Sequence, residues 1–104
     1  MNVEHLREIF KGNIAKIVGK IKRGEPIGHD MYMNAYNIKD STRILEEDLE
    51  KGEGNQETKP RLETIRKFGG YIDECAELHR CKARGCGQAD AECDRLIDRV
   101  NAWA

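Results

Sequence analysis

Residues 2–22 read NVEHLREIFKGNIAKIVGKIK, and this stretch decides the fold class. Its apolar residues recur at steps of three or four, the period of one face of an α-helix, over about six turns. We therefore expect a long N-terminal helix with a single apolar stripe. The stripe consists of Val3, Leu6, Phe10, Ile14, Ile17 and Ile21.

The next stretch predicts a tight connection and a second helix. Gly24 suits the left-handed position after a helix end, and Pro26 cannot continue a helix. We expect the second helix to start near His29 or Asp30, whose side chain would cap free backbone N–H groups, and to run to about Lys51. Its expected buried stripe is Met31, Ala35, Ile38, Thr42, Leu45 and Leu49.

A loop and a third helix follow. Residues from about 52 to 58 contain two glycines and no apolar side chain, which predicts an exposed, mobile loop. Pro60 fits the first helical position, where its missing N–H is not needed. Inside the third helix, Gly69 and Gly70 each cost about 1 kcal/mol relative to alanine, so we expect them to mark a close helix crossing.

The end of the chain completes the predicted fold. Residues 84–87 predict a turn, and a short last helix is expected from Ala89 or Asp90. Helices joined by short connections predict an all-α fold, a small antiparallel bundle of about four helices, in a single domain of residues 1–104. The first helix is much longer than the last, so its apolar stripe exceeds what the same chain covers. We therefore expect a homo-oligomer, with a dimer as its commonest symmetric form.

Composition narrows the functional class. Charged residues make up 36% of the chain and apolar residues 38%, which predicts a charged domain with a thin core. The apolar runs are too short to span a membrane, and the first residues lack the apolar region of a secretory signal, so we expect a cytoplasmic protein. The sequence has no phosphate-binding loop, nucleophile elbow or His-Glu-x-x-His motif, and we expect too little volume for a ligand cavity of about 300 Å³. We therefore expect no enzymatic activity.

Four cysteines gather in the last third of the sequence, and they allow three interpretations. The first, which we favour, is reduced thiols with no cofactor, with Cys75 and Cys93 buried as small apolar side chains. The second is a zinc site formed by Cys75, His79, Cys86 and Cys93. The third is a pair of disulfides, Cys75 with Cys93 and Cys81 with Cys86, which requires an oxidising compartment. The spacing of four between Cys81 and Cys86 lies only at the limit of the usual zinc pattern.

Charge is divided unevenly along the chain although the net charge is −1. Residues 1–23 carry six bases against two acids, a net of +4, and residues 24–58 carry three bases against nine acids, a net of −6. Acidic residues near the N-terminus of a helix and basic residues near its C-terminus stabilise the helix, and this accounts for part of the uneven distribution of charge. The alternative is a contact to the phosphates of a nucleic acid. Its residues would be Lys16, Lys20, Lys22 and Arg23.

The stretch MYMNAY, residues 31–36, concentrates adaptable and aromatic side chains. On a helix, Tyr32 and Tyr36 share a face and Met33 lies close to them, a combination that is enriched at protein interfaces. We therefore expect partner binding at Tyr32, Met33 and Tyr36. The favoured interpretation is a small non-enzymatic protein-interaction module, such as a stoichiometric inhibitor, adaptor or accessory protein of bacterial or phage type.

Overall fold

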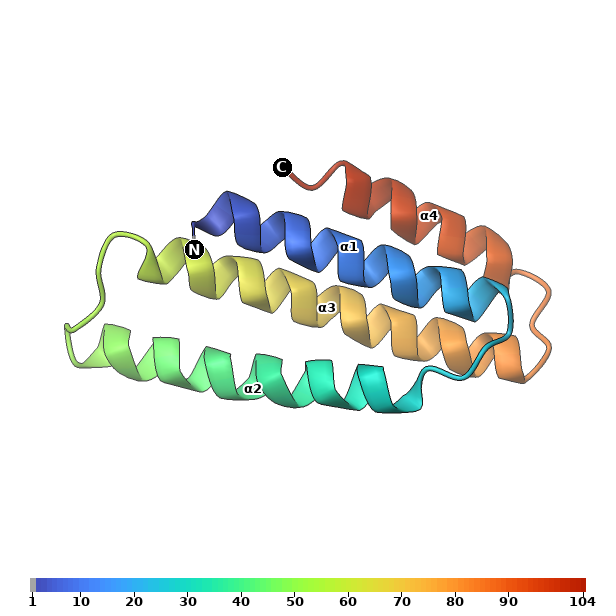
Figure 1. Ribbon diagram of the computed structural model, residues 1–104, viewed down its shortest axis with the longest axis horizontal. Helices are drawn as coiled ribbons and strands as arrows, with labels where there is room; N and C mark the ends of the chain where they lie inside the picture. Colours follow the sequence, from blue (N-terminus) through green and yellow to red (C-terminus); the bar gives the residue numbers. More distant parts are fainter. Residues whose placement is uncertain (1) are drawn as a thin grey trace.

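The chain folds into a bundle of four helices (Figure 1). The computed structural model describes the backbone of residues 2–104 and the side chains of residues 2–28 and 36–104. The all-α fold class is confirmed, because the described residues form helices and turns without a strand. The helices are α1 (Val3–Lys22), α2 (Gly28–Glu50), α3 (Thr58–Ala83) and α4 (Ala89–Asn101).

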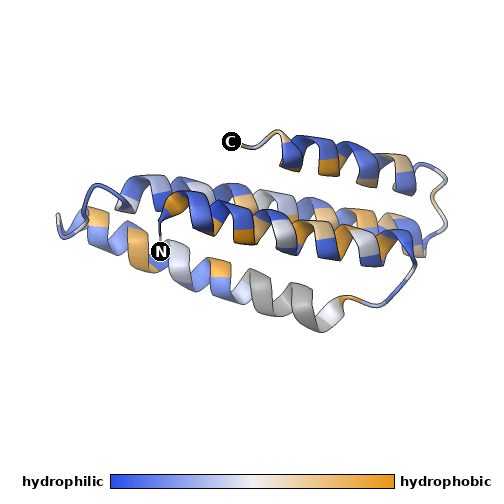
Figure 2. Cartoon of the chain, turned by 45° about the horizontal axis from the view of Figure 1, so that its top comes forward, coloured by the Kyte–Doolittle hydropathy of each residue, from blue (hydrophilic) through white to orange (hydrophobic). Residues whose placement is uncertain are grey.

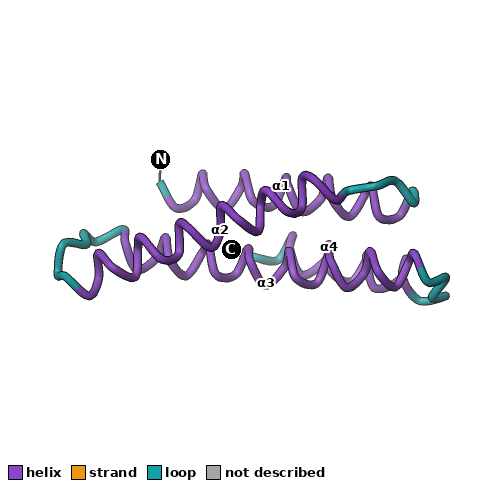
Figure 3. Tube along the Cα trace, turned by 90° about the horizontal axis from the view of Figure 1, so that it is seen from below, coloured by secondary structure: helices purple, strands orange, loops and turns teal. Residues whose placement is uncertain are grey.

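Helix α3 is the longest and lies between α1 and α2 (Figure 1). The connecting loops lie at the two ends of the bundle (Figure 3), so consecutive helices run antiparallel. Helix α4 packs against both α1 and α3. Helix α2 packs mainly against α3. The result is an elongated body of 48 × 24 × 17 Å. No helix in the described part of the chain is long and apolar enough to cross a membrane.

The core lies where α1, α3 and α4 meet. Figure 2 shows that the apolar side of α4 faces α1 and α3. The second half of the apolar stripe predicted for α1, Ile14, Ile17 and Ile21, is buried here, whereas Val3, Leu6 and Phe10 are half-buried. None of the described side chains of α2 is buried, so α2 covers the core only partly. The core consists of Ile14, Ile17, Val18, Ile21, Ile27, Phe68, Tyr71, Ile72, Cys75, Cys93, Leu96, Val100 and Trp103.

The ends of the helices follow local signals at some places and packing at others. Gly24 has a φ of +72°, and the N–H of Glu25 donates to the carbonyl oxygen of Lys20 at 2.9 Å, which confirms the glycine-ended α1. The predicted cap of α2 is wrong: this helix begins at Gly28, and the residue before it, Ile27, makes no side-chain cap. Ile27 is only 3% exposed, so packing of its side chain in the core fixes where α2 begins.

Two further predictions for α2 and α3 need correction. Helix α3 begins at Thr58, which makes Pro60 its third residue and ends the exposed loop one residue early. The N–H groups of a first helical turn have no partner inside the helix, so proline is tolerated there as well. Leu49 was predicted to be buried but is 41% exposed, while Ile38 and Leu45 are half-buried. The side chains of Met31 and Ala35 lie outside the described residues.

The close crossing predicted at the glycine pair involves Gly69 and α2. A Cβ atom placed on Gly69 would lie 3.3 Å from the Cγ2 atom of Ile38, whereas one on Gly70 would meet nothing within 4 Å. Helix α3 continues through both glycines without a break. Gly69 therefore sets how closely α2 approaches α3.

Candidate interaction surface

A groove runs between α1 and α2, with α3 as its floor. It has a volume of about 510 Å³, larger than the sequence predicted for any cavity of this chain. It exists because α1 and α2 both pack on α3 and have no comparable contact with each other. The groove is lined by Leu6, Phe10, Asn13, Asn37, Ile38, Ser41, Ile44, Leu45, Arg61, Ile65 and Phe68.

Two phenylalanines from different helices join one wall of the groove to its floor. The rings of Phe10 on α1 and Phe68 on α3 lie nearly parallel, with centroids 4.0 Å apart. Phe68 is buried and Phe10 half-buried, so the stack reaches from the core to the groove surface. It places a rigid apolar base beneath the open space.

The rim of the groove is also apolar. Ile44 on α2 lines the groove and is 53% exposed, and Ile9 on α1 is 40% exposed. Ile9 is three residues from Leu6, so the two are neighbours on the surface of α1. Large apolar side chains that remain exposed beside an apolar groove are typical of a contact surface for another protein.

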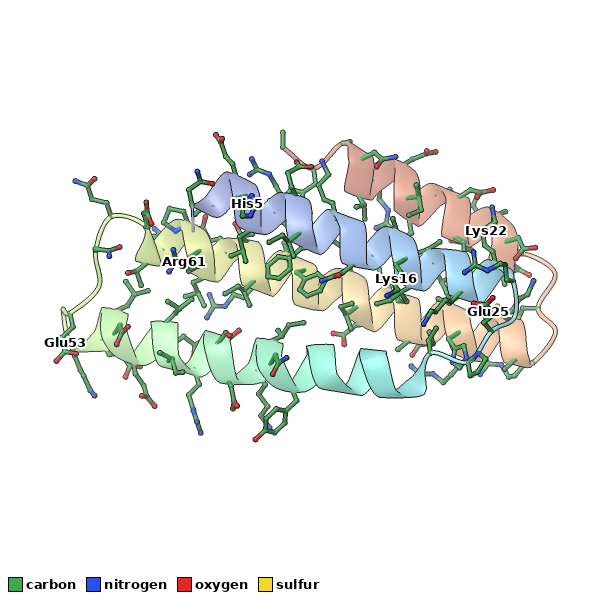
Figure 4. The ribbon with its side chains drawn as sticks, viewed as in Figure 1. His5, Lys16, Lys22, Glu25, Glu53 and Arg61 are labelled. Carbon is green, nitrogen blue, oxygen red and sulfur yellow. The ribbon has the colours of Figure 1, made fainter. Side chains whose placement is uncertain are left out.

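Almost all side chains that line the groove are uncharged. Arg61, at the start of α3 (Figure 4), is the ionisable member of the set that lines the groove, and its guanidinium lies 3.4 Å from a carboxylate oxygen of Glu57. An arginine side chain stays protonated at any ordinary pH. The groove therefore offers apolar contact and amide or hydroxyl hydrogen bonds rather than a proton-transfer group.

Tyr36, the described residue of the predicted tyrosine surface, lies outside the groove. Tyr36 is 65% exposed, and it is not among the residues that line the groove. Leu45 follows nine residues later, a rotation of about 900° or half a turn, so Tyr36 and Leu45 point in opposite directions. The side chains of Tyr32 and Met33 lie outside the described residues. Helix α2 thus carries exposed side chains both in the groove, at Ile44, and outside it, at Tyr36.

The basic end of α1 is partly paired with acids. The Nζ atom of Lys22 lies 2.6 Å from a carboxylate oxygen of Asp94 on α4, and this contact raises the pKa of Lys22. The guanidinium of Arg23 donates to Glu25 at 3.0 and 3.2 Å, which lowers the pKa of Glu25. Lys16 is exposed on α1, away from Lys22 (Figure 4). Lys22 and Arg23, which were predicted for nucleic-acid contact, are therefore paired with carboxylates of the same chain.

The cysteines form two pairs at different depths. Cys75 and Cys93 are fully buried in the core, and burial raises the pKa of Cys75 to about 12. Cys81 and Cys86 are half-buried at the turn after α3. Among the side chains that the structure describes, no three His, Cys, Asp or Glu residues could hold a metal ion together, so the alternative zinc set of Cys75, His79, Cys86 and Cys93 is not brought together.

The chain matches no protein family, no curated protein and no solved structure. Its function is therefore argued from its own surfaces. Sequence reasoning missed the groove, although one signal pointed toward it: Ile44 adds an apolar residue beside the expected stripe of α2 and widens its apolar face. Periodicity identifies such a face but does not say which neighbour covers it.

Proposed function

We propose that this chain is a small non-enzymatic protein-interaction module that self-associates through the groove between α1 and α2. The proposal rests on the apolar groove and rim, which the chain does not cover by itself. A stoichiometric inhibitor, adaptor or accessory protein is the functional class that suits this design. The nearly neutral lining supports the absence of enzymatic activity, and the four free thiols support a cytoplasmic location.

The occupant of the groove is a second copy of this chain, because the charges of its two walls complement each other. The sequence of α1, residues 3–22, has a net charge of +3, and that of α2, residues 28–50, a net charge of −4. A two-fold axis parallel to the groove would stack α1 of one copy over α2 of the other, and basic over acidic segments. A two-fold axis across the groove would instead place α1 over α1 and α2 over α2, so that segments of like charge would face each other. Complementary charges of this kind favour and orient association.

The size of the face supports the same occupant. The broad side of the bundle measures 48 by 24 Å, which exceeds the roughly 800 Å² per partner of a standard protein interface. Stacking two such faces would bury Ile44 and Ile9, the exposed apolar residues of the rim. Tyr36 does not line the groove and would stay accessible, and Tyr32, Met33 and Tyr36 remain the proposed surface for a different protein partner.

The test compares two exposed positions of one helix: Ile44→Asp changes a residue that lines the groove, and Tyr36→Asp changes one that does not. Both side chains are more than half exposed, so both variants are expected to fold. Light scattering after size exclusion should give twice the chain mass of 11.9 kDa for the wild type and for Tyr36→Asp. Ile44→Asp should weaken the dimer at least about tenfold, equivalent to about 1.4 kcal/mol.

Two outcomes contradict the proposal. A wild-type chain that is monomeric at all concentrations excludes the second copy, and leaves the groove to a helix from another protein. A dimer that Tyr36→Asp disrupts and Ile44→Asp does not would place the interface on the tyrosine face instead. Circular dichroism of both variants checks that the helices are intact.

A further inference from the structure

The turn after α3 brings two cysteines together through its backbone. Gly85 has a φ of +79°, and its N–H donates to the carbonyl oxygen of Lys82 at 3.0 Å. The N–H of Cys86 reaches one step further back and donates to the carbonyl oxygen of Cys81, also at 3.0 Å. These bonds define a Schellman motif, in which the side chains at the two ends of the longer bond characteristically touch. In this turn both of those side chains are thiols.

The backbone bond limits how far apart the cysteines are. The nitrogen of Cys86 and the carbonyl oxygen of Cys81 are 3.0 Å apart, and standard bond lengths then hold the two Cα atoms within about 7 Å. Disulfides join Cα atoms at about 4.4–6.8 Å. The turn therefore already places the two residues near the separation that a disulfide needs, without movement of either helix.

The same motif ends α1 and α2, and there it joins other residue types. The N–H of Glu25 donates to Lys20 at the end of α1, and the N–H of Glu53 donates to Asp48 at the end of α2, each at 2.9 Å. The geometry is thus a general property of these helix ends. Of these three helix ends, only the end of α3 has a cysteine at both ends of this hydrogen bond.

The two thiols differ in their surroundings. The sulfur of Cys86 accepts a hydrogen bond from the Cys81 thiol and another from Arg84, and both lower its pKa. The same contact with Cys86 raises the pKa of Cys81. Both side chains are half-buried, so small molecules in solution reach them. A thiolate with a lowered pKa and an exposed sulfur is the nucleophile in thiol–disulfide exchange.

The other cysteine pair provides an internal contrast. Cys75 and Cys93 are fully buried, and burial raises the pKa of both thiols, that of Cys75 to about 12. Neither sulfur is accessible to a reagent in the folded protein. One molecule thus carries an accessible pair at a turn and an inaccessible pair in its core.

We propose that Cys81 and Cys86 are a redox-active dithiol that reacts with small-molecule disulfides and closes the α3–α4 turn with a reversible disulfide. The Cys86 thiolate attacks one sulfur of a disulfide such as oxidised glutathione, forms a mixed disulfide and releases one glutathione thiolate. Cys81 then loses its proton, attacks the Cys86 sulfur and releases the second. Two protein thiols are oxidised, one disulfide is reduced to two thiols, and the two thiol protons pass to the glutathione products.

The experiment incubates the folded full-length chain in buffers of increasing ratio of oxidised to reduced glutathione. Free thiols are then alkylated in denaturant, and the chain is cut after glutamate. This cleavage separates Cys75, Cys93 and the peptide of residues 78–92, which holds both Cys81 and Cys86. We expect that peptide to lose two hydrogen atoms and both alkyl groups as the ratio rises, while Cys75 and Cys93 stay alkylated.

Two variants test the order of the steps. Cys81→Ser should stop at a mixed disulfide, with one glutathione on Cys86, because the resolving thiol is missing. Cys86→Ser should form a mixed disulfide on Cys81 at least about tenfold more slowly, because Cys81 lacks the hydrogen bonds that favour a thiolate. The proposal is overturned if residues 78–92 stay fully alkylated at every ratio, if Cys75 and Cys93 oxidise first, or if Cys86→Ser reacts as fast as Cys81→Ser.

Discussion

The core of this bundle is concentrated in three helices, and substitution of two leucines measures that asymmetry. Leu96 on α4 is 0% exposed and belongs to the core, whereas Leu49 near the end of α2 is 41% exposed. Both substitutions, Leu96→Ala and Leu49→Ala, remove the same atoms from a helix. They therefore differ only in what surrounds the side chain.

The expected costs follow from burial. Leu96→Ala should lower the free energy of unfolding by about 2–5 kcal/mol, the range for a fully buried leucine that leaves a cavity. Full burial of a leucine side chain is worth about 1.5–3 kcal/mol, and Leu49 is buried only in part, so Leu49→Ala should cost less than about 1.5 kcal/mol. We therefore expect the loss for Leu96→Ala to exceed that for Leu49→Ala by at least about 0.5 kcal/mol.

Urea unfolding followed by far-ultraviolet circular dichroism measures both losses, at one protein concentration so that association contributes equally. The slope of the unfolding free energy against urea must stay constant for the comparison to hold. Equal losses for the two variants, or a loss below about 1.5 kcal/mol for Leu96→Ala, would refute the conclusion that α4 completes the core and α2 does not.

Three further predictions concern single positions. Gly70→Ala should stabilise the chain by about 0.5–1 kcal/mol in urea unfolding, because its Cβ meets nothing, while Gly69→Ala should be less stable than Gly70→Ala because its Cβ would lie 3.3 Å from Ile38. Gly85→Ala should cost about 1–2 kcal/mol in the same assay, since the φ of this residue is +79°. The pKa of Cys75 is raised to about 12, so the unfolded thiol ionises at lower pH than the folded one, and stability should fall between about pH 9 and 12. Cys75 should contribute about 1.4 kcal/mol per pH unit to this slope, and the slope should be shallower by that amount in Cys75→Ala, as urea unfolding at a series of pH values would measure.

The sequence predicted those features of the fold that depend on local signals. The stripe of α1 from Ile14 to Ile21 recurs with a helical period, and Gly24 ends this helix because it adopts a left-handed conformation there. The start of α2 was mispredicted because a tertiary contact determines it. Burial of Ile27 in the core places the beginning of the helix ahead of the polar residues that local rules favour as caps.

The candidate groove was beyond prediction for a related reason. Apolar spacing shows that Leu45 and Ile38 belong to one face of α2, but the same spacing is compatible with complete burial. How far that face is covered depends on the approach of α2 to α3 at Gly69, and on α4 packing against α1 and α3 rather than against α2. Both are properties of the assembled bundle. The tyrosine surface was predicted from residue type alone, and it stays a prediction.

The stability of α2 is linked to binding in the groove, because α2 forms one wall of the groove. Helix α2 packs mainly on α3, and none of its described side chains is fully buried. A helix with few buried side chains opens more readily than the rest of the fold. An occupant that touches both α1 and α2 supplies the second neighbour that α2 lacks. Binding at the groove and the stability of α2 are then thermodynamically linked, so that an occupant stabilises α2. It follows that Gly69→Ala, which displaces α2 without contacting an occupant, should weaken the proposed dimer, whereas Gly70→Ala should leave it unchanged.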